Sequence, residues 1–256
     1  MPVDPSSDRA VFRQIADELR SSIKDGTYGP GSRLPSENEL AKRYDVTRVT
    51  VRRALGELAA EGLTVSQHGR GVFVRSTPVI VRASLARFSR KRRQEGDGAF
   101  AAEVKRLGMV PRQRLTEVGE IDPPDFVADA LNLSSGEKVV VRRRVMFADD
   151  LPLQLADSYF ASSLAAGTKL LDEDSGPGGS YARVEEEGHT LARFREDLTA
   201  RMPTPEEARA LQLGTGVPVV QLRRIAYDQD GRAVEVFDSV VAADKYQFTY
   251  EFDAPE

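Results

Sequence analysis

The chain has no cysteine and only two histidines among its 256 residues. Without cysteine there can be no disulfide, no thiolate ligand for a metal and no cysteine nucleophile, and a reducing cytoplasm is the natural compartment. The two histidines, His68 and His189, are too few for a histidine-rich metal set, and no Ser-His-Asp set can be assembled from the sequence. We therefore expect no metal site, no catalytic residues and no cofactor, and we expect that the protein is not an enzyme.

Long apolar runs are also missing. No stretch approaches the roughly 18 apolar residues that a membrane span needs, and the polar start MPVDPSSD lacks the basic and apolar regions of a signal peptide. We expect a soluble, cytoplasmic protein with no membrane partner. A chain of 256 residues is long enough for two domains, each with a core of its own.

The sign of the charge changes along the chain. Residues 1–98 carry a net charge of +6 and residues 99–256 a net charge of -10, within a total of -4. Such a division suits a protein that places one end on the phosphates of a nucleic acid and holds the other end away from them. Uneven charge on ordinary solvated surfaces is the alternative that charge alone leaves open.

The first 75 residues predict a compact helical module with a β-hairpin. Ser36 stands three residues before Glu39, the spacing of a capping box, and Thr47 is a candidate N-cap for the next helix. Hydrophobic periodicity and these caps predict helices over 9–25, 36–44 and 47–60, and β-prone runs around a Gly-rich tip predict strands over 63–67 and 72–75. This order is that of a winged helix-turn-helix, whose third helix enters the major groove of DNA.

The remainder divides into a linker and a second domain. Residues 76–98 contain Pro78 and a charged, Gly-containing run without apolar periodicity, which predicts a linker. For residues 99–256 we predict strands over 114–121, 138–147, 153–160, 191–200, 218–228 and 232–241. We predict helices over 123–131, 161–170, 180–188 and 204–212, and a loop over 174–179. The fold class is α+β, with an antiparallel sheet in the second domain.

The third predicted helix concentrates groups that read DNA. Arg48 and Arg52 lie one turn apart, Thr47 and Thr50 are in the first turn, and Arg53 is nearby. An arginine can donate two hydrogen bonds to guanine, and threonine binds phosphate or contacts a thymine methyl group. A solvated helix face with ordinary arginines is the alternative. The capped preceding helix and the Gly-rich hairpin favour DNA binding.

Three motifs in this module resemble the GntR family of bacterial regulators. They are Pro30-Gly-Ser-Arg-Leu-Pro-Ser-Glu-Asn-Glu-Leu-Ala, Tyr44-Asp-Val-Thr-Arg-Val-Thr-Val-Arg-Arg-Ala-Leu, and Gln67-His-Gly-Arg-Gly-Val-Phe-Val. The resemblance implies that the second helix, the recognition helix and the hairpin tip contact operator DNA. The residues at these positions are Arg33, Ser36, Glu37, Asn38, Thr47, Arg48, Thr50, Arg52, Arg53, His68, Gly69 and Arg70. Asn38 replaces a frequent arginine and Val49 a frequent threonine or serine, so the base preference is expected to differ from that of a typical member.

The second domain resembles the UTRA ligand-binding domain of the HutC-type subfamily. The similarity rests on Leu131-Asn-Leu-Ser-Ser-Gly-Glu-Lys-Val, Leu211-Gln-Leu-Gly-Thr-Gly-Val-Pro218 and shorter motifs between and after them. It implies a fold similar to that of chorismate lyase, dimerisation through this domain and a small-molecule effector in a cleft of the sheet. Ser180, Tyr181, Glu235 and Tyr246 match positions that line the pocket in relatives.

Two arginines are candidate effector ligands from the residue pattern itself. Arg142 and Arg144 alternate with Arg143 on a predicted strand, so they share one face. Two guanidinium groups on one face suit a carboxylate or a phosphate. Surface arginines bridged to nearby acids are the alternative. Met146 stands where members that sense phosphorylated sugars tend to have a further arginine, which weakens the phosphosugar hypothesis.

The sequence therefore predicts a homodimeric, effector-responsive repressor that binds double-stranded operator DNA. A DNA-binding repressor without an effector is the alternative. Catalysis is a third class, since the second domain resembles a lyase in fold, but a fold does not establish an activity.

Overall fold

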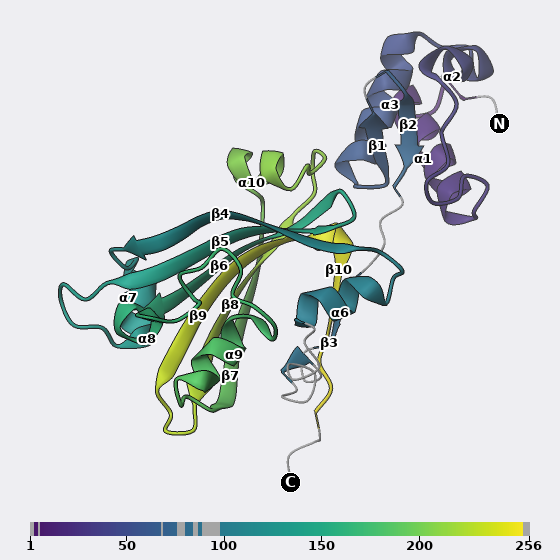
Figure 1. Ribbon diagram of the computed structural model, residues 1–256. Coiled ribbons are helices and arrows are strands. Elements are labelled where there is room, and N and C mark those ends of the chain that lie inside the picture. Colours follow the sequence, from purple (N-terminus) through teal and green to yellow (C-terminus); the bar gives the residue numbers. More distant parts are fainter. Residues whose placement is uncertain are drawn as a thin grey trace. The chain divides into compact units, whose positions relative to one another are not determined.

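The computed structural model describes residues 3–4, 6–67, 69–75, 80–83, 87–88 and 98–252 (Figure 1). The chain divides into two compact units. One is Met1–Pro78 with Leu213–Val217, and the other is Val79–Gln212 with Pro218–Glu256. Separate hydrophobic clusters lie in the two units, so each has its own core.

The first unit is a three-helix module with a β-hairpin. Its elements are α1 (Val11–Lys24), α2 (Glu37–Tyr44), α3 (Arg48–Ala60), β1 (Thr64–Gln67) and β2 (Gly71–Val74). Ile15 of α1, Leu40 of α2 and Leu58 of α3 are fully buried in one cluster, which Val74 of the hairpin completes. The predicted helices and hairpin are confirmed, with small differences at their ends.

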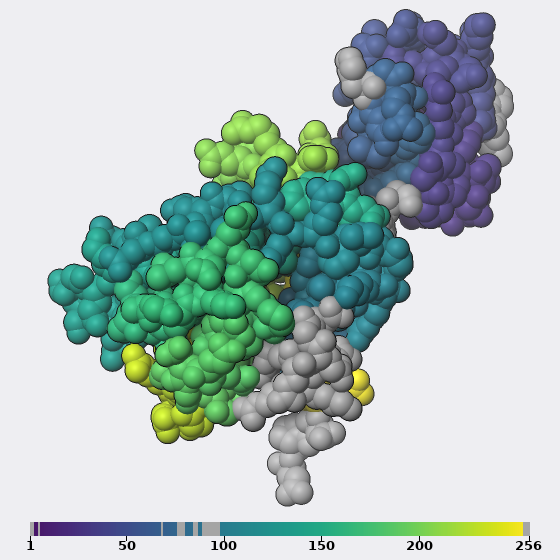
Figure 2. Space-filling model, in the orientation of Figure 1, coloured from purple at the N-terminus to yellow at the C-terminus, as the bar shows by residue number. Residues whose placement is uncertain are grey.

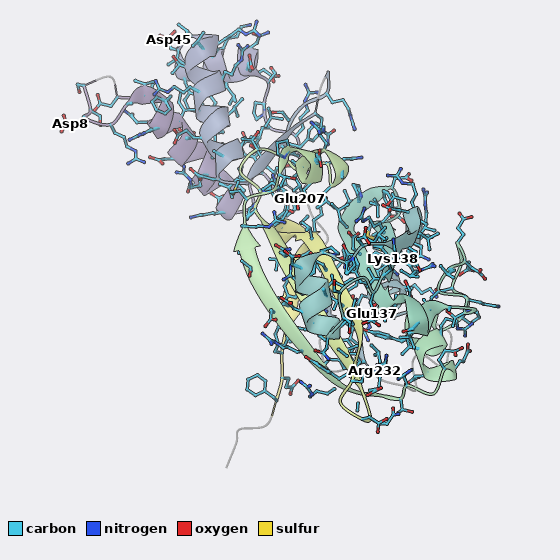
Figure 3. All side chains as sticks on the ribbon, turned by 90° about the vertical axis from the view of Figure 1, so that its left-hand side faces the viewer. Asp8, Asp45, Glu137, Lys138, Glu207 and Arg232 are labelled. Atoms are coloured by element: carbon cyan, nitrogen blue, oxygen red, sulfur yellow. The ribbon has the colours of Figure 1, made fainter. Side chains whose placement is uncertain are left out.

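The turn between α2 and α3 is fixed by local chemistry. The Ser36 hydroxyl accepts a hydrogen bond from the Glu39 amide, and the Glu39 carboxylate accepts one from the Ser36 amide, at 3.3 and 2.7 Å. This is the predicted capping box. At the other end Asp45, labelled in Figure 3, adopts a left-handed conformation with φ of 54° and ends α2. The short turn leads directly into the Thr47 cap of α3.

The second unit is built on a six-stranded antiparallel sheet. Its strands are β4 (Pro111–Ile121), β5 (Val139–Ala148), β6 (Leu151–Ala161), β7 (Leu191–Arg201), β8 (Val219–Asp228) and β9 (Ala233–Ala242), in the spatial order β4-β5-β6-β9-β8-β7. Its helices are α6 (Ala99–Lys105), α7 (Asp125–Leu131), α8 (Ser162–Ala165), α9 (Gly179–Glu186), α10 (Pro205–Ala210) and the short 3-10 helix η1 (Ala243–Lys245). The predicted α+β class with an antiparallel sheet is confirmed.

The sheet consists of two similar halves. Each half runs strand, helix, strand, strand: β4-α7-β5-β6 in one and β7-α10-β8-β9 in the other. Asn132 and Gln212 follow the helix in each half, and both have a left-handed backbone. The halves meet where β6 pairs with β9. The repeat makes Arg144 of β5 and Arg224 of β8 equivalent positions, as the alignment of the two motifs that begin at Leu131 and Leu211 shows.

The two faces of the sheet have different coverings. Val139 and Val141 of β5 pack in one cluster with Val127 of α7. Val140 packs in another cluster with Val184 of α9. Because side chains alternate along a strand, the α9 face is also the face of Arg142 and Arg144.

One strand lies inside the predicted linker, and the linker prediction is wrong there. Residues 80–83 form β3 (Ile80–Ala83), which pairs in parallel with β10 (Tyr246–Thr249). Ile80 is fully buried against Phe100 and Val104 of α6. The linker was predicted from the charged run that follows, so the short β-prone segment before it was not recognised. The other residues of the predicted linker, apart from 87–88 and 98, lie outside the described residues.

The predicted helix over 161–170 is also wrong in length. Helix α8 covers only Ser162–Ala165, and Gly167 two residues later has φ of 75°. A left-handed residue cannot continue an α-helix. The following chain instead packs Leu170 into the core between the sheet and α9.

Candidate DNA interface and effector cavity

The beginning of α3 presents to solvent the groups that were predicted to read DNA. The side chains of Arg48 and Arg52 are 60% and 64% exposed, and Val49 is 73% exposed. Thr47 caps the helix by accepting a hydrogen bond from the Thr50 amide at 3.3 Å, and the two hydroxyl oxygens are 3.0 Å apart. Guanidinium, hydroxyl and methyl groups are therefore gathered at the helix end that meets base edges in this motif.

The predicted contacts on and before α2 have different surroundings. Arg33 and Asn38 are exposed. The Ser36 hydroxyl is engaged in the helix cap. The Glu37 carboxylate accepts hydrogen bonds from both Arg48 and Arg52 of α3. The sequence did not indicate this bridge between the two helices.

The remaining predicted DNA contacts lie on α3 and at the hairpin tip. The guanidinium of Arg53 lies 3.9 Å from the centre of the Phe12 ring and so packs against α1. Gly69 and Arg70 are exposed at the tip, where Gly69 needs a left-handed φ of 71°. His68 lies outside the described residues.

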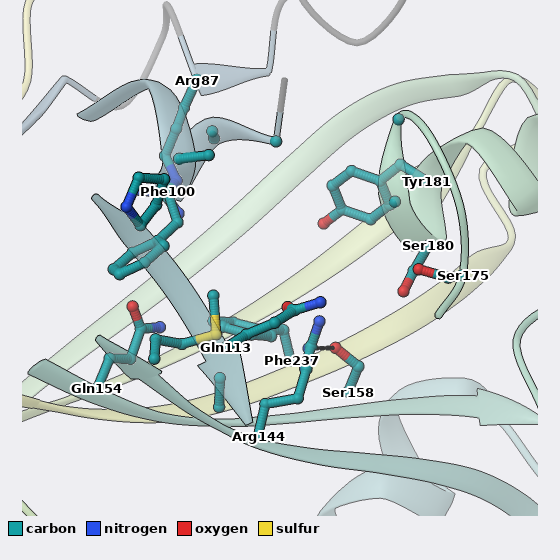
Figure 4. Close-up of a pocket in the computed structure, with 18 of the residues that line it drawn as sticks. Arg87, Phe100, Gln113, Arg144, Gln154, Ser158, Ser175, Ser180, Tyr181 and Phe237 are labelled. Atoms are coloured by element: carbon teal, nitrogen blue, oxygen red, sulfur yellow. Dashed lines mark hydrogen bonds between the residues drawn. The ribbon is translucent and has the colours of Figure 1, made fainter. Parts of the chain in front are cut away.

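A cavity of about 370 Å³ lies in the second unit. In the space-filling view, the teal surface that includes the α6 segment and the green surface that includes the α9 segment face the viewer on the same side of the second unit (Figure 2). Polar side chains of the sheet line the floor of the cavity: Gln113, Arg144, Gln154, Ser158, Arg224 and Glu235. Phe100 of α6, Ser180 and Tyr181 of α9, and Ser175 and Arg87 line the remainder (Figure 4).

Arg144 is a buried, charged side chain on which the charges of Glu235 and Asp157 act without forming an ion pair. Its Nη2 atom donates a hydrogen bond to Ser158 Oγ at 2.6 Å (Figure 4). Within the described part of the chain, no carboxylate forms an ion pair with it. Burial lowers the pKa of the guanidinium to about 10, so the group remains charged at neutral pH. Arg144 therefore brings into the cavity a positive charge that no carboxylate of the described residues contacts directly.

The equivalent arginine of the other half is neutralised by the protein. Arg224 lies 3.7 Å from Glu196 and 3.6 Å from Glu235. Glu196 also accepts hydrogen bonds from Arg82 of β3. Burial raises the pKa of the neighbouring Tyr181 hydroxyl well above its usual value, so this group is a neutral donor at physiological pH.

Two residues predicted to bind the effector do not line this cavity, which corrects those predictions. Arg142 donates hydrogen bonds to the backbone carbonyls of Leu170, Asp172 and Glu173 and is 1% exposed. The Tyr246 hydroxyl donates to Gln154 Oε1 at 3.4 Å and so supports a lining residue. Both side chains are engaged by parts of the chain that are distant in sequence.

Several lining residues were missed from the sequence. Arg224 was identifiable from the repeat, since it follows the motif at Leu211 at the same distance as Arg144 follows the motif at Leu131. Gln113, Gln154 and Ser158 stand on strands with no local signal of function. Only the pairing of the strands brings them to one place.

Other kinds of site have no support among the described residues. No group of three or more His, Asp or Glu side chains there is arranged to hold a metal ion. None of the helices in the described ranges combines the length and the apolar character that a bilayer span requires.

Two family models match the chain. Residues 12–74 match the family described as "Bacterial regulatory proteins, gntR family", and residues 106–247 match the "UTRA domain". A gntR-type winged helix with a UTRA domain and its cavity defines a ligand-responsive, DNA-binding transcription regulator. The chain belongs to the GntR family and has the UTRA domain of its HutC-type members, so the resemblance seen in the sequence is confirmed.

Individual relatives agree with this assignment over the whole chain. An uncharacterized HTH-type transcriptional regulator of Streptomyces coelicolor is 31% identical over 96% of this chain and 93% of its own. The HTH-type transcriptional repressor NagR of Bacillus subtilis is 31% identical over 99% of each chain. The crystal structure of PhnF from Mycobacterium smegmatis, 24% identical, has a TM-score of 0.60 and covers 96% of this chain and 100% of PhnF, which shows a shared fold.

Proposed function

We propose that this regulator is a cytoplasmic, homodimeric repressor that leaves its operator when a small molecule with a single anionic group, a carboxylate, binds the cavity. On this proposal the first unit contacts DNA, the second binds the effector, and the protein needs no cofactor and catalyses no reaction. The similarity to the transcriptional repressor NagR of Bacillus subtilis supports repression as the regulatory role.

The unpaired charge of Arg144 carries the proposal. The residues opposite Arg224 on neighbouring strands are Glu196 and Phe237, and those opposite Arg144 are Leu115 and Ala156. The half with Arg224 thus places a carboxylate directly opposite its arginine, whereas the half with Arg144 places none there. Since a buried charge is costly without a partner, a carboxylate of the effector fits beside Arg144 and Ser158.

The size and polarity of the cavity limit the remainder of the effector. A volume of about 370 Å³ is in the range of small-molecule sites. Gln113, Gln154 and Ser180 offer hydrogen bonds to hydroxyl or amide groups. Met146 also lines the cavity. A cation at this position would be a second one beside Arg144 and would favour a phosphate dianion, but methionine carries no charge. These features favour a polar monocarboxylate such as a sugar acid over a phosphate ester.

Matched pairs of ligands test the proposal. Thermal unfolding of the full chain is measured with sugar acids and with the corresponding sugar phosphates, for example gluconate and glucose 6-phosphate. We expect the sugar acids to stabilise the protein against thermal unfolding and to lower its operator affinity about 5- to 150-fold. Arg144→Ala should abolish both effects and retain operator binding in the absence of ligand.

Arg143→Ala is the matched control. Arg143 lies on the opposite face of β5 and pairs with Glu117 and Asp157, so it does not line the cavity. Its variant should respond to the ligand as the wild type does. Full induction of the Arg144→Ala variant would show that the proposed anion site is wrong.

A further inference from the structure

The two arginines of the recognition helix share one carboxylate. Glu37, at the start of α2, lies 3.2 Å from Arg48 Nη2 and 2.8 Å from Arg52 Nη2. Arg52 Nε also donates to Glu37 at 3.0 Å. The hydrogen bond from Arg52 lowers the pKa of the Glu37 carboxyl, so the group is charged at neutral pH. A negative charge is thereby placed on the surface that is to meet DNA.

The geometry leaves the reading edge of Arg52 open. Its Nε and Nη2 atoms, along one side of the guanidinium, are directed to Glu37. An arginine has five N–H donors, and three of them remain, of which one on Nη1 and one on Nη2 face the far edge of the guanidinium. That edge is the fork that binds the O6 and N7 atoms of guanine. Arg52 can therefore bind Glu37 and a base at the same time.

We propose that Glu37 is a positioning residue that sets the sequence specificity of the regulator by holding Arg48 and Arg52 in a base-reading orientation and away from phosphates. The proposal rests on the proposed DNA interface. Both arginines are more than half exposed, so without a partner each would sample many rotamers. The carboxylate also repels the phosphate backbone, which weakens sequence-independent binding.

The two effects predict an opposite response of specific and non-specific binding. Neutralising Glu37 frees both arginines for phosphates, so affinity for DNA of unrelated sequence should rise while affinity for the selected sequence falls. A change that only disturbed folding would lower both affinities together. The ratio of the two affinities therefore distinguishes positioning from structural support.

The test uses Glu37→Gln and Glu37→Ala in the full chain. The wild type first selects duplexes from a random-sequence library, and the recovered duplex and a scrambled version are then titrated at several salt concentrations. We expect Glu37→Gln to lower the ratio of selected to scrambled affinity about tenfold, equal to about 1.4 kcal/mol. The salt dependence on scrambled DNA should become steeper by about one phosphate contact.

Glu57→Gln is the matched control. It removes the same charge from α3, and in the described part of the chain Arg48 and Arg52 form their ion pairs with Glu37 and not with Glu57. Its affinity ratio should equal that of the wild type. Glu37 variants with an unchanged ratio and salt dependence would overturn the inference, as would a ratio that changes equally in Glu57→Gln. If the wild type selects no duplex at all, the proposed DNA interface itself fails, which is a separate result.

Discussion

At the scale of single residues, neighbouring arginines on one strand have different surroundings. Arg142 and Arg144 share a face of β5, and the alternation of side chains predicted this correctly. The sequence could not separate their roles, because the carbonyl groups that surround Arg142 belong to residues 170–173. A contact between segments that are distant in the chain leaves no periodic signal in either of them.

Replacing Arg142 should therefore reduce stability and not ligand recognition. Arg142→Met keeps most of the side-chain volume but leaves three carbonyl acceptors without their charged donor. We expect the free energy of unfolding of the second unit to fall by about 2–4 kcal/mol, measured by urea titration. Arg143→Met, at a partly exposed site, should cost less than about 1 kcal/mol. A stable Arg142→Met protein that no longer binds effector would assign Arg142 to the cavity after all.

At the scale of elements, long periodic segments were predictable and short ones were not. The three helices of the first unit have apolar stripes, α2 and α3 also have side-chain caps, and the long strands have regular alternation. The four-residue strands β3 and β10 have neither, and their parallel pairing joins the two ends of the second unit. Helix α8 was predicted too long because the left-handed backbone at Gly167 is not evident from composition.

Strand β3 is anchored to the large sheet by an ion pair, which predicts a pH dependence. Burial alone would raise the pKa of Glu196, but the hydrogen bond and the charge of Arg82 hold it below its usual value. The ionised carboxylate therefore stabilises the fold above the pKa of the unfolded chain, and this stability is lost as the pH falls through the folded pKa. In urea titrations at decreasing pH, Glu196→Gln should be less stable than the wild type at neutral pH, with a smaller loss in acid. Parallel pH profiles for the two proteins would contradict this assignment.

At the scale of the whole molecule, the proposed dimer can be measured directly. One winged helix-turn-helix contacts too few base pairs for useful specificity, so two copies on a palindromic site are expected. Light scattering should give about twice the chain mass of 28.2 kDa. Footprinting should protect two half-sites one helical turn apart or a multiple of that distance. A strictly monomeric protein that protects a single half-site would exclude this mode of binding.

The repeated halves of the sheet also have an evolutionary consequence. Duplication of an ancestral strand-helix-strand-strand unit would have produced two identical anion-binding positions, one at Arg144 and one at Arg224. In this chain Glu196 lies opposite Arg224, whereas Leu115 lies opposite Arg144. On the proposed function, a related protein in which these two opposing side chains were exchanged would bind the anion of its effector at the other arginine, within the same cavity.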